Sequence, residues 1–101
     1  MLIKVKNKDT LVVDDFIFKC CVGKKGLNKN KIEGDNSTPR GLFSLGKLYY
    51  RSDRVNKPET KLKVKKINRS MGWSIDNKSG TYNSEIKINN KIKHEKLFRR
   101  D

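Results

Sequence analysis

The sequence has few of the residues that stabilise small secreted domains or bind metals. It contains two cysteines, which are adjacent, and one histidine. Consecutive Cα atoms lie about 3.8 Å apart, below the usual separation of about 4.4–6.8 Å between disulfide-bonded residues, so Cys20 and Cys21 do not suggest a disulfide framework. One histidine and two adjacent cysteines cannot supply the four spaced ligands of a structural zinc site. No metal site and no cofactor are therefore predicted.

Long apolar runs are also absent. No apolar run approaches the roughly 18 residues of a membrane-spanning helix. The first apolar residues meet Lys4 at once, which is not the pattern of a secretory signal, so neither a membrane span nor a signal peptide is predicted. The glycines and lysines of residues 23–26 lack the spacing of a phosphate-binding loop and its Lys-Ser/Thr end, and they are interpreted as a turn.

Positive charge is abundant, with a formal net charge of +14. The lysines are spread from Lys4 to Lys96 and outnumber the arginines, although arginine is the better fork for phosphates and base edges. This distribution favours a solvated lysine surface. Nucleic acid is not predicted as a partner beyond an unspecific attraction between charges.

Hydrophobic periodicity is mostly two, which is typical of β-strands. With 101 residues the chain is one domain at most, and the fold class predicted is all-β, a β-sandwich or barrel. The residues between polar turns at 71–73 are not assigned to a strand, and only 94–100 could be helical. The expected strands are 2–5 and 10–13, which form a hairpin around residues 7–9, then 16–22, 41–50, 62–67 and 85–88.

Strand alternation places Phe16, Phe18, Cys20 and Val22 on one face. We expect Phe16, Phe18, Phe43 and Trp73 to point into a core.

The candidate nucleophiles are the two cysteines. A catalytic thiol needs a stabilised thiolate and a base within reach, whereas Cys20 and Cys21 are expected in mid-strand among apolar residues, where free cysteine packs as a small hydrophobic group. His94 is expected on the surface or at a helix start, and its pairing with either thiol does not follow from the spacing. No catalytic, cofactor-binding or metal-ligating residue is therefore assigned.

An ordered series of motifs resembles a known family. The series comprises Gly-Asp-x-x-Thr-Pro-x-Gly-x-Phe at residues 34–43, Tyr-Arg-x-Asp-Arg at 50–54, Gly72 with Trp73, Tyr82 with Asn83, and "HEKLF" at 94–98. Together these stretches resemble the N-terminal part of an L,D-transpeptidase catalytic domain of the YkuD type. Residues 1–101 are accordingly expected to be the N-terminal portion of one such β-sandwich domain, incomplete at its C-terminal end.

The resemblance implies a bacterial cell-wall enzyme. Such enzymes use a cysteine thiolate for acyl transfer on peptidoglycan stem peptides, and they work in the cell envelope or periplasm. Their catalytic histidine and their Ser/Thr-x-Gly-Cys motif come later in the domain than the matched stretches, and neither is found in residues 1–101, so this chain alone is predicted to be inactive. His94 matches the family's His-Glu-x-Leu segment, not its catalytic histidine.

Two alternatives stay open. One is a non-catalytic basic β-domain that binds nucleic acid or an anionic wall polymer, which requires a basic stripe with exposed aromatic residues. The other is a catalytically inactive family member that is retained for wall binding.

Overall fold

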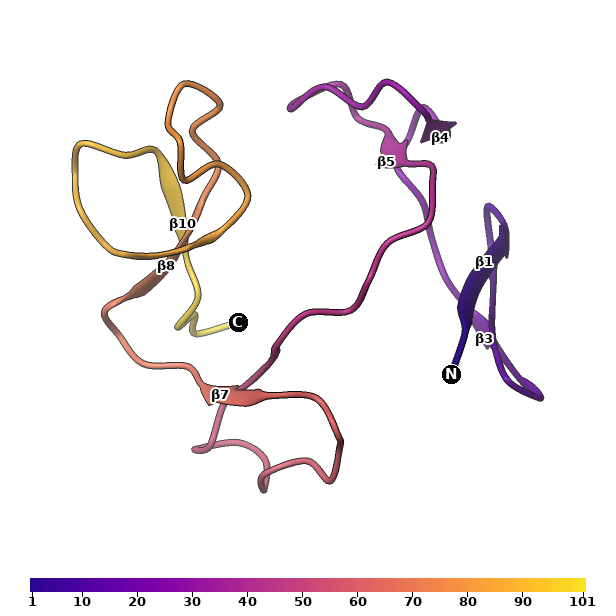
Figure 1. The fold of residues 1–101 in the computed structure, drawn as a ribbon, viewed down its shortest axis with the longest axis horizontal. Helices are drawn as coiled ribbons and strands as arrows, with labels where there is room; N and C mark the ends of the chain where they lie inside the picture. The colour runs from indigo at the N-terminus through magenta and orange to yellow at the C-terminus, as the bar shows by residue number, and fades with distance from the viewer. The chain divides into compact units, whose positions relative to one another are not determined.

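The computed structural model describes all of residues 1–101, and its regular structure consists only of β-strands. The strands form four small sheets, two of three strands and two of two strands. The all-β prediction is therefore confirmed. In chain order the strands are β1 (Ile3–Asn7), β2 (Thr10–Val13), β3 (Phe16–Lys19), β4 (Leu27–Asn28), β5 (Thr38–Pro39), β6 (Leu48–Tyr50), β7 (Val64–Lys66), β8 (Met71–Ser74), β9 (Glu85–Lys87) and β10 (His94–Lys96) (Figure 1).

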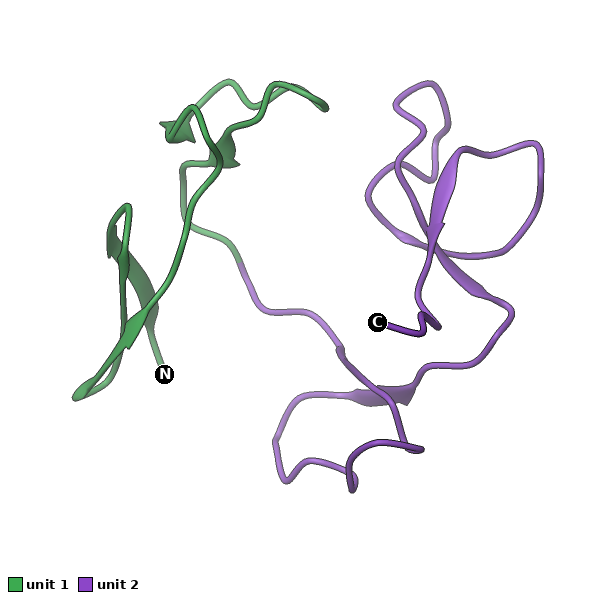
Figure 2. Cartoon of the chain, turned by 180° about the vertical axis from the view of Figure 1, so that it is seen from behind, with its two compact units in different colours: residues 1–43 green, residues 44–101 purple.

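The chain divides into two compact units, Met1–Phe43 and Ser44–Asp101, which are coloured separately in Figure 2. Strands β1 to β5 belong to the first unit and strands β6 to β10 to the second. Each sheet therefore lies within one unit, because its strands all come from the same unit. The structure contains no helix with the length and apolar composition needed to cross a membrane.

The first unit begins with an antiparallel sheet in the order β1–β2–β3. The side-chain oxygen of Asn7 accepts a hydrogen bond of 3.1 Å from the backbone N–H of Asp9, a turn that asparagine favours. Asp14, at the turn into β3, has a φ of 50°, a left-handed value that aspartate tolerates better than most residues. The predicted hairpin is confirmed, and β3 begins at Phe16 as predicted but ends at Lys19.

The two faces of this sheet differ in chemistry. Residues directly opposite each other in antiparallel strands point to the same side. The register therefore gives one face only apolar side chains, and we call this set the apolar face: Ile3, Val5, Leu11, Val13, Phe16 and Phe18. The opposite face is mixed and contains Lys4, Thr10, Val12, Ile17 and Lys19.

The apolar face is open to solvent. Phe16 is 67% exposed and Phe18 is 49% exposed, with their ring centroids 6.4 Å apart. The prediction that these phenylalanines pack in a core is therefore wrong. Alternation decides toward which side of the strand a residue points, but burial also requires a second layer on that side.

The predicted strand from Gly41 to Tyr50 forms only at its end, as β6. Strand β6 pairs in parallel with β7, from Leu48 opposite Val64 to Tyr50 opposite Lys66, and no strand pairs with the residues before it. Phe43 is 68% exposed, so its predicted burial is wrong as well. An extended segment needs a partner for its backbone N–H and C=O groups before it becomes part of a sheet.

The second unit has a small core around its central strand, β8. Met71 is 4% exposed, Tyr50 is 8% exposed and Ser74 is fully buried. Strand β8 lies between β9 and β10 in an antiparallel sheet. A Cβ at Gly72 would lie only 3.2 Å from Ile88 Cγ1 and 3.3 Å from the backbone oxygen of Glu95, so glycine permits this close packing.

Two sequence predictions are wrong in this sheet. Met71–Trp73 was expected between turns, and it forms the most buried strand of the chain. The segment 94–100 was interpreted as the one stretch that could be helical, but His94–Lys96 is strand β10, with His94 opposite Ser74 and Lys96 opposite Gly72. Pairing with β8 satisfies the backbone of this short segment, and such tertiary contacts outweigh a weak local preference for helix.

Candidate functional site

The Gly34–Phe43 motif lies in a loop that folds back on the glycines at 23–26. Strands β4 and β5 pair in parallel over two residues. The backbone N–H of Thr38 donates to the Gly26 oxygen at 2.8 Å, and that of Lys25 donates to the Asn36 oxygen at 2.9 Å. The Thr38 hydroxyl accepts a hydrogen bond of 2.7 Å from the N–H of Gly23. The threonine of the motif thus fastens the two ends of the loop together.

Asp35 organises the tip of this loop. Its carboxylate accepts hydrogen bonds from the Ile32 backbone N–H at 2.9 Å and from the backbone N–H and hydroxyl of Ser37 at 2.9 and 2.7 Å. It also pairs with Lys31 Nζ at 2.6 Å. These bonds favour the charged form and hold the pKa of the Asp35 carboxyl well below its usual range. Gly34 and Asn36 flank it with φ values of 83° and 60°, which these residue types tolerate.

We predict that the loop loses its order in acid. Because the folded pKa of Asp35 lies below its ordinary value of 3.8, its contribution to stability is present above that value and is lost as the pH falls further. In two-dimensional NMR spectra, the amide signals of Ile32 and Ser37 should hold their positions down to about pH 4 and then move toward random-coil values. Asp35→Asn should show the displaced signals at neutral pH.

The control for this prediction is Asp15→Asn, which removes a carboxylate that lies in an exposed turn. It should leave both amide signals in place. Wild-type signals in Asp35→Asn at neutral pH would contradict the role given to the carboxylate.

The two cysteines lie just beyond the end of β3, not in mid-strand as predicted. Both thiols are free, with Cys20 half-buried and Cys21 exposed. The backbone N–H of Cys20 donates to the Asp9 oxygen at 2.9 Å, which extends the pairing of the sheet by one bond. No hydrogen bond, ion pair or ring contact activates either sulfur, so the geometry offers no reason to call either one a nucleophile.

His94 is half-buried on β10, in the second unit, whereas both cysteines belong to the first. The expected helix start at His94 is therefore wrong, because His94 begins a strand, and its side chain is partly exposed at the surface. Its Nδ1 lies 2.7 Å from the Ile92 backbone oxygen, and its ring packs against Gly72, where a Cβ would come within 3.3 Å of Cδ2. These contacts fit a packing role.

Several motif residues of the second unit contact one another around β8. Trp73 Nε1 donates to Asn83 Oδ1 at 3.1 Å, and its ring meets that of Tyr49 edge to face at 6.1 Å between centroids. Glu85 accepts a bond of 2.8 Å from the Tyr49 hydroxyl and pairs with Lys65 at 2.6 Å. These partners lower the pKa of Glu85, while partial burial and the carboxylate raise the pKa of Tyr49.

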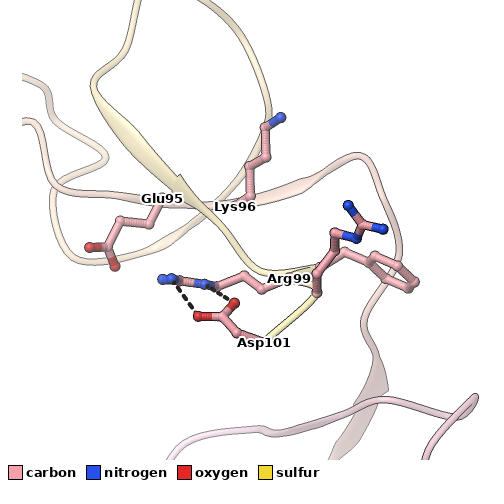
Figure 3. Close-up of a pocket in the computed structure, with 6 residues that line it drawn as sticks. Glu95, Lys96, Arg99 and Asp101 are labelled. Carbon is pink, nitrogen blue, oxygen red and sulfur yellow. Dashed lines mark hydrogen bonds and ion pairs between the residues drawn. The ribbon is translucent and has the colours of Figure 1, made fainter.

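A hollow of about 440 Å³ is formed by the last residues of the second unit, and both acidic and basic side chains line it (Figure 3). Its lining residues are Glu95, Lys96, Phe98, Arg99, Arg100 and Asp101. The Arg51 guanidinium lies 3.6 Å from the Phe98 ring centroid, and that of Arg69 lies 4.7 Å from it. Such stacking attracts a guanidinium group to the face of the ring, and Arg51 also pairs with the Asp53 carboxylate.

Sequence reasoning missed both the Glu85 contacts and the gathering of arginines. Glu85 lies 36 residues from Tyr49 and 20 from Lys65, so nothing in the local pattern joins them. The arginines did leave a signal, because all of them except Arg40 occur between residues 51 and 100. The lysines, which are more numerous and spread along the whole chain, made this uneven distribution of the arginines less apparent.

Comparison of the chain with protein-family models, with curated proteins and with solved structures finds no match. The structure also contains no group of three or more His, Cys, Asp or Glu side chains placed to hold a metal ion.

Proposed function

We propose that this chain forms part of a β-sandwich catalytic domain of the L,D-transpeptidase type, which acts on peptidoglycan stem peptides. The observation that supports the proposal most is the convergence of separate motif stretches in the second unit. The Trp73 side chain donates a hydrogen bond to that of Asn83, and Glu95 lies opposite Trp73 in the antiparallel sheet. The Arg51 guanidinium stacks on the Phe98 ring. Stretches that resemble one family in order along the chain are expected to contact one another if they form one part of its fold.

The proposal gives the described residues a scaffolding role. Thr38 and Asp35 fix the motif loop, and β8 with its neighbours forms the small core. The chemistry of such a domain is acyl transfer: a thiolate attacks the stem-peptide carbonyl, the terminal D-amino acid leaves, and an amine then takes the acyl group from the thioester. We do not assign the thiolate to Cys20 or Cys21, so the proposal requires a nucleophile motif outside residues 1–101.

The test is to read the coding DNA beyond codon 101 and to express the extended protein. We expect an open frame that encodes Ser/Thr-x-Gly-Cys, and an extended product that exchanges the terminal D-amino acid of a stem tetrapeptide. Substituting the cysteine of that motif should abolish the exchange, and the chain of residues 1–101 should show none.

Two outcomes would contradict the proposal. One is turnover by residues 1–101 that disappears in Cys20→Ala and in Cys21→Ala. The other is a stop codon directly after codon 101 in a gene expressed at this length, which would favour a non-catalytic binding protein.

A basic domain that binds an anionic polymer is the second candidate. The exposure of Phe16 and Phe18 favours it, because stacking platforms for single-stranded nucleic acid need accessible aromatic rings. However, Lys4 and Lys19 lie on the opposite face of the sheet from the exposed rings, so these two cations cannot help to bind a stacked strand. Saturable shifts of both phenylalanine ring signals on titration with a short oligothymidine would favour this second function over the first.

A further inference from the structure

The arginines of this chain are gathered around one aromatic ring. Arg51 and Arg69 lie over Phe98, and Arg54 donates to the backbone oxygens of Arg99 and Arg100. Arg40 alone belongs to the first unit. We call the five arginines of the second unit, together with Phe98, the arginine cluster.

Three members of the arginine cluster already have partners. Arg51 holds the Asp53 carboxylate with two bonds of 2.8 and 2.7 Å and also donates to the Arg99 oxygen. Arg99 holds the Asp101 carboxylate with two bonds of 3.0 Å, drawn as dashed lines in Figure 3. Arg54 donates to backbone oxygens. Arg51 and Arg54 thus hold the backbone of the segment that carries Arg100.

The remaining cations have no acidic partner. Arg69 is engaged only with the Phe98 ring, and neither Arg100 nor Lys96 forms an ion pair. Glu95, the nearest acidic residue in sequence to Lys96, points away from it (Figure 3). Lys96 and Arg100 line the hollow with Phe98, over which Arg69 lies. Two acidic residues line it as well, Glu95 and Asp101, and the Asp101 carboxylate is already held by Arg99. Cations without an acidic partner repel one another, and a bound anion would relieve that repulsion.

We propose that Arg69, Lys96 and Arg100 bind a terminal phosphate group, either free phosphate or a phosphate monoester. A carboxylate accepts two parallel hydrogen bonds from a single guanidinium group. Asp53 already binds Arg51 in this way, and Asp101 binds Arg99. A terminal phosphate carries nearly two negative charges and three strong acceptor oxygens, so it can accept from several cations at once. The inference does not depend on the enzymatic proposal above.

The experiment uses the whole chain of residues 1–101 with ¹⁵N-labelled arginine. Inorganic phosphate, glycerol phosphate and acetate are titrated separately, with sodium chloride holding the ionic strength constant. We expect saturable shifts of the Arg100 Nε and Phe98 ring signals with phosphate or with glycerol phosphate, and binding about tenfold weaker for acetate. Tighter binding of glycerol phosphate would identify a monoester as the ligand, and tighter binding of inorganic phosphate would identify the free ion.

Arg100→Gln is the decisive variant, because its guanidinium forms no hydrogen bond, ion pair or ring contact within the protein and the backbone spectrum should stay unchanged. It should raise the Kd for phosphate about tenfold, the effect of losing one charge-assisted bond, and Arg69→Gln should do the same. Arg40→Gln removes the same charge outside the arginine cluster and should change the Kd less than twofold. An equal effect from Arg40→Gln, or shifts that do not saturate, would overturn the proposal in favour of diffuse attraction to a basic chain.

Discussion

Replacing Met71 by alanine should unfold the second unit or leave it close to unfolding. Met71 is 4% exposed on the central strand β8, and Tyr50 is the only other buried apolar residue of the chain. Truncating a buried methionine to alanine costs about 2–5 kcal/mol through lost burial and the cavity left behind. Small domains have a net stability of roughly 5–15 kcal/mol, and so small a core places this unit at the lower end. The loss is therefore comparable with the whole stability of the unit.

Trp73 provides the measurement, because it is the only tryptophan and it neighbours Met71 on β8. The fluorescence of Trp73 during urea unfolding should show a transition in the wild type. In Met71→Ala the midpoint of this transition should move to a much lower urea concentration, or the transition should disappear. The matched control is Met1→Ala, which changes the same residue type at a position that is 84% exposed. Equal midpoints for the two variants would show that Met71 is not part of a cooperative core.

Gly23→Ala should open the motif loop of the first unit. A Cβ at Gly23 would lie 2.5 Å from the backbone oxygen of Asn36 and 2.6 Å from the carbonyl carbon of Ser37. Both are backbone atoms, so no side-chain rotation can relieve the clash and the two segments must separate. Separation breaks the bonds of Gly23 N–H to Thr38 and of Lys25 N–H to Asn36, each contributing about 0.5–1.5 kcal/mol.

Hydrogen exchange at the Lys25 and Thr38 amides reports this opening. Both amides donate across the loop, so their protection should fall by at least about tenfold in Gly23→Ala. Gly46→Ala is the control, since a Cβ there meets no atom within 4 Å, and its protection pattern should match the wild type. Retained protection in Gly23→Ala would mean that the loop tolerates a side chain at this point.

The sequence alone predicted the features that depend on neighbours along the chain. The hairpin of β1 and β2 follows from alternation around a polar turn, and β3, β7 and β9 begin within two residues of their expected positions. Met71–Trp73 was expected between polar turns and not as a strand, because its pairing with β9 and with β10, which lies close to Gly72, depends on residues distant in sequence. The strand β10 was missed for the same reason, since only β8 makes those residues extended.

Burial and the candidate site were harder to predict, because both depend on residues distant in sequence. The alternation of Phe16 and Phe18 correctly placed them on one side of β3, but it could not show that this side stays open. The role of Thr38 within the motif loop follows from Gly23, which lies 15 residues earlier. The sequence shows which residues are positively charged, but only the fold shows that Arg51 and Arg69 lie over the Phe98 ring.

The unlike faces of the β1–β2–β3 sheet fix the alignment of its strands. If β1 slipped by one residue along β2, every side chain of β1 would change sides. Lys4 would then join the apolar face, and Ile3 and Val5 would move to the mixed face. A slip of β3 would do the same with Lys19. Each slipped pairing would interrupt the apolar face with a lysine side chain and remove apolar neighbours from it. These lysines therefore help to select a single strand alignment, even where their contribution to stability is small.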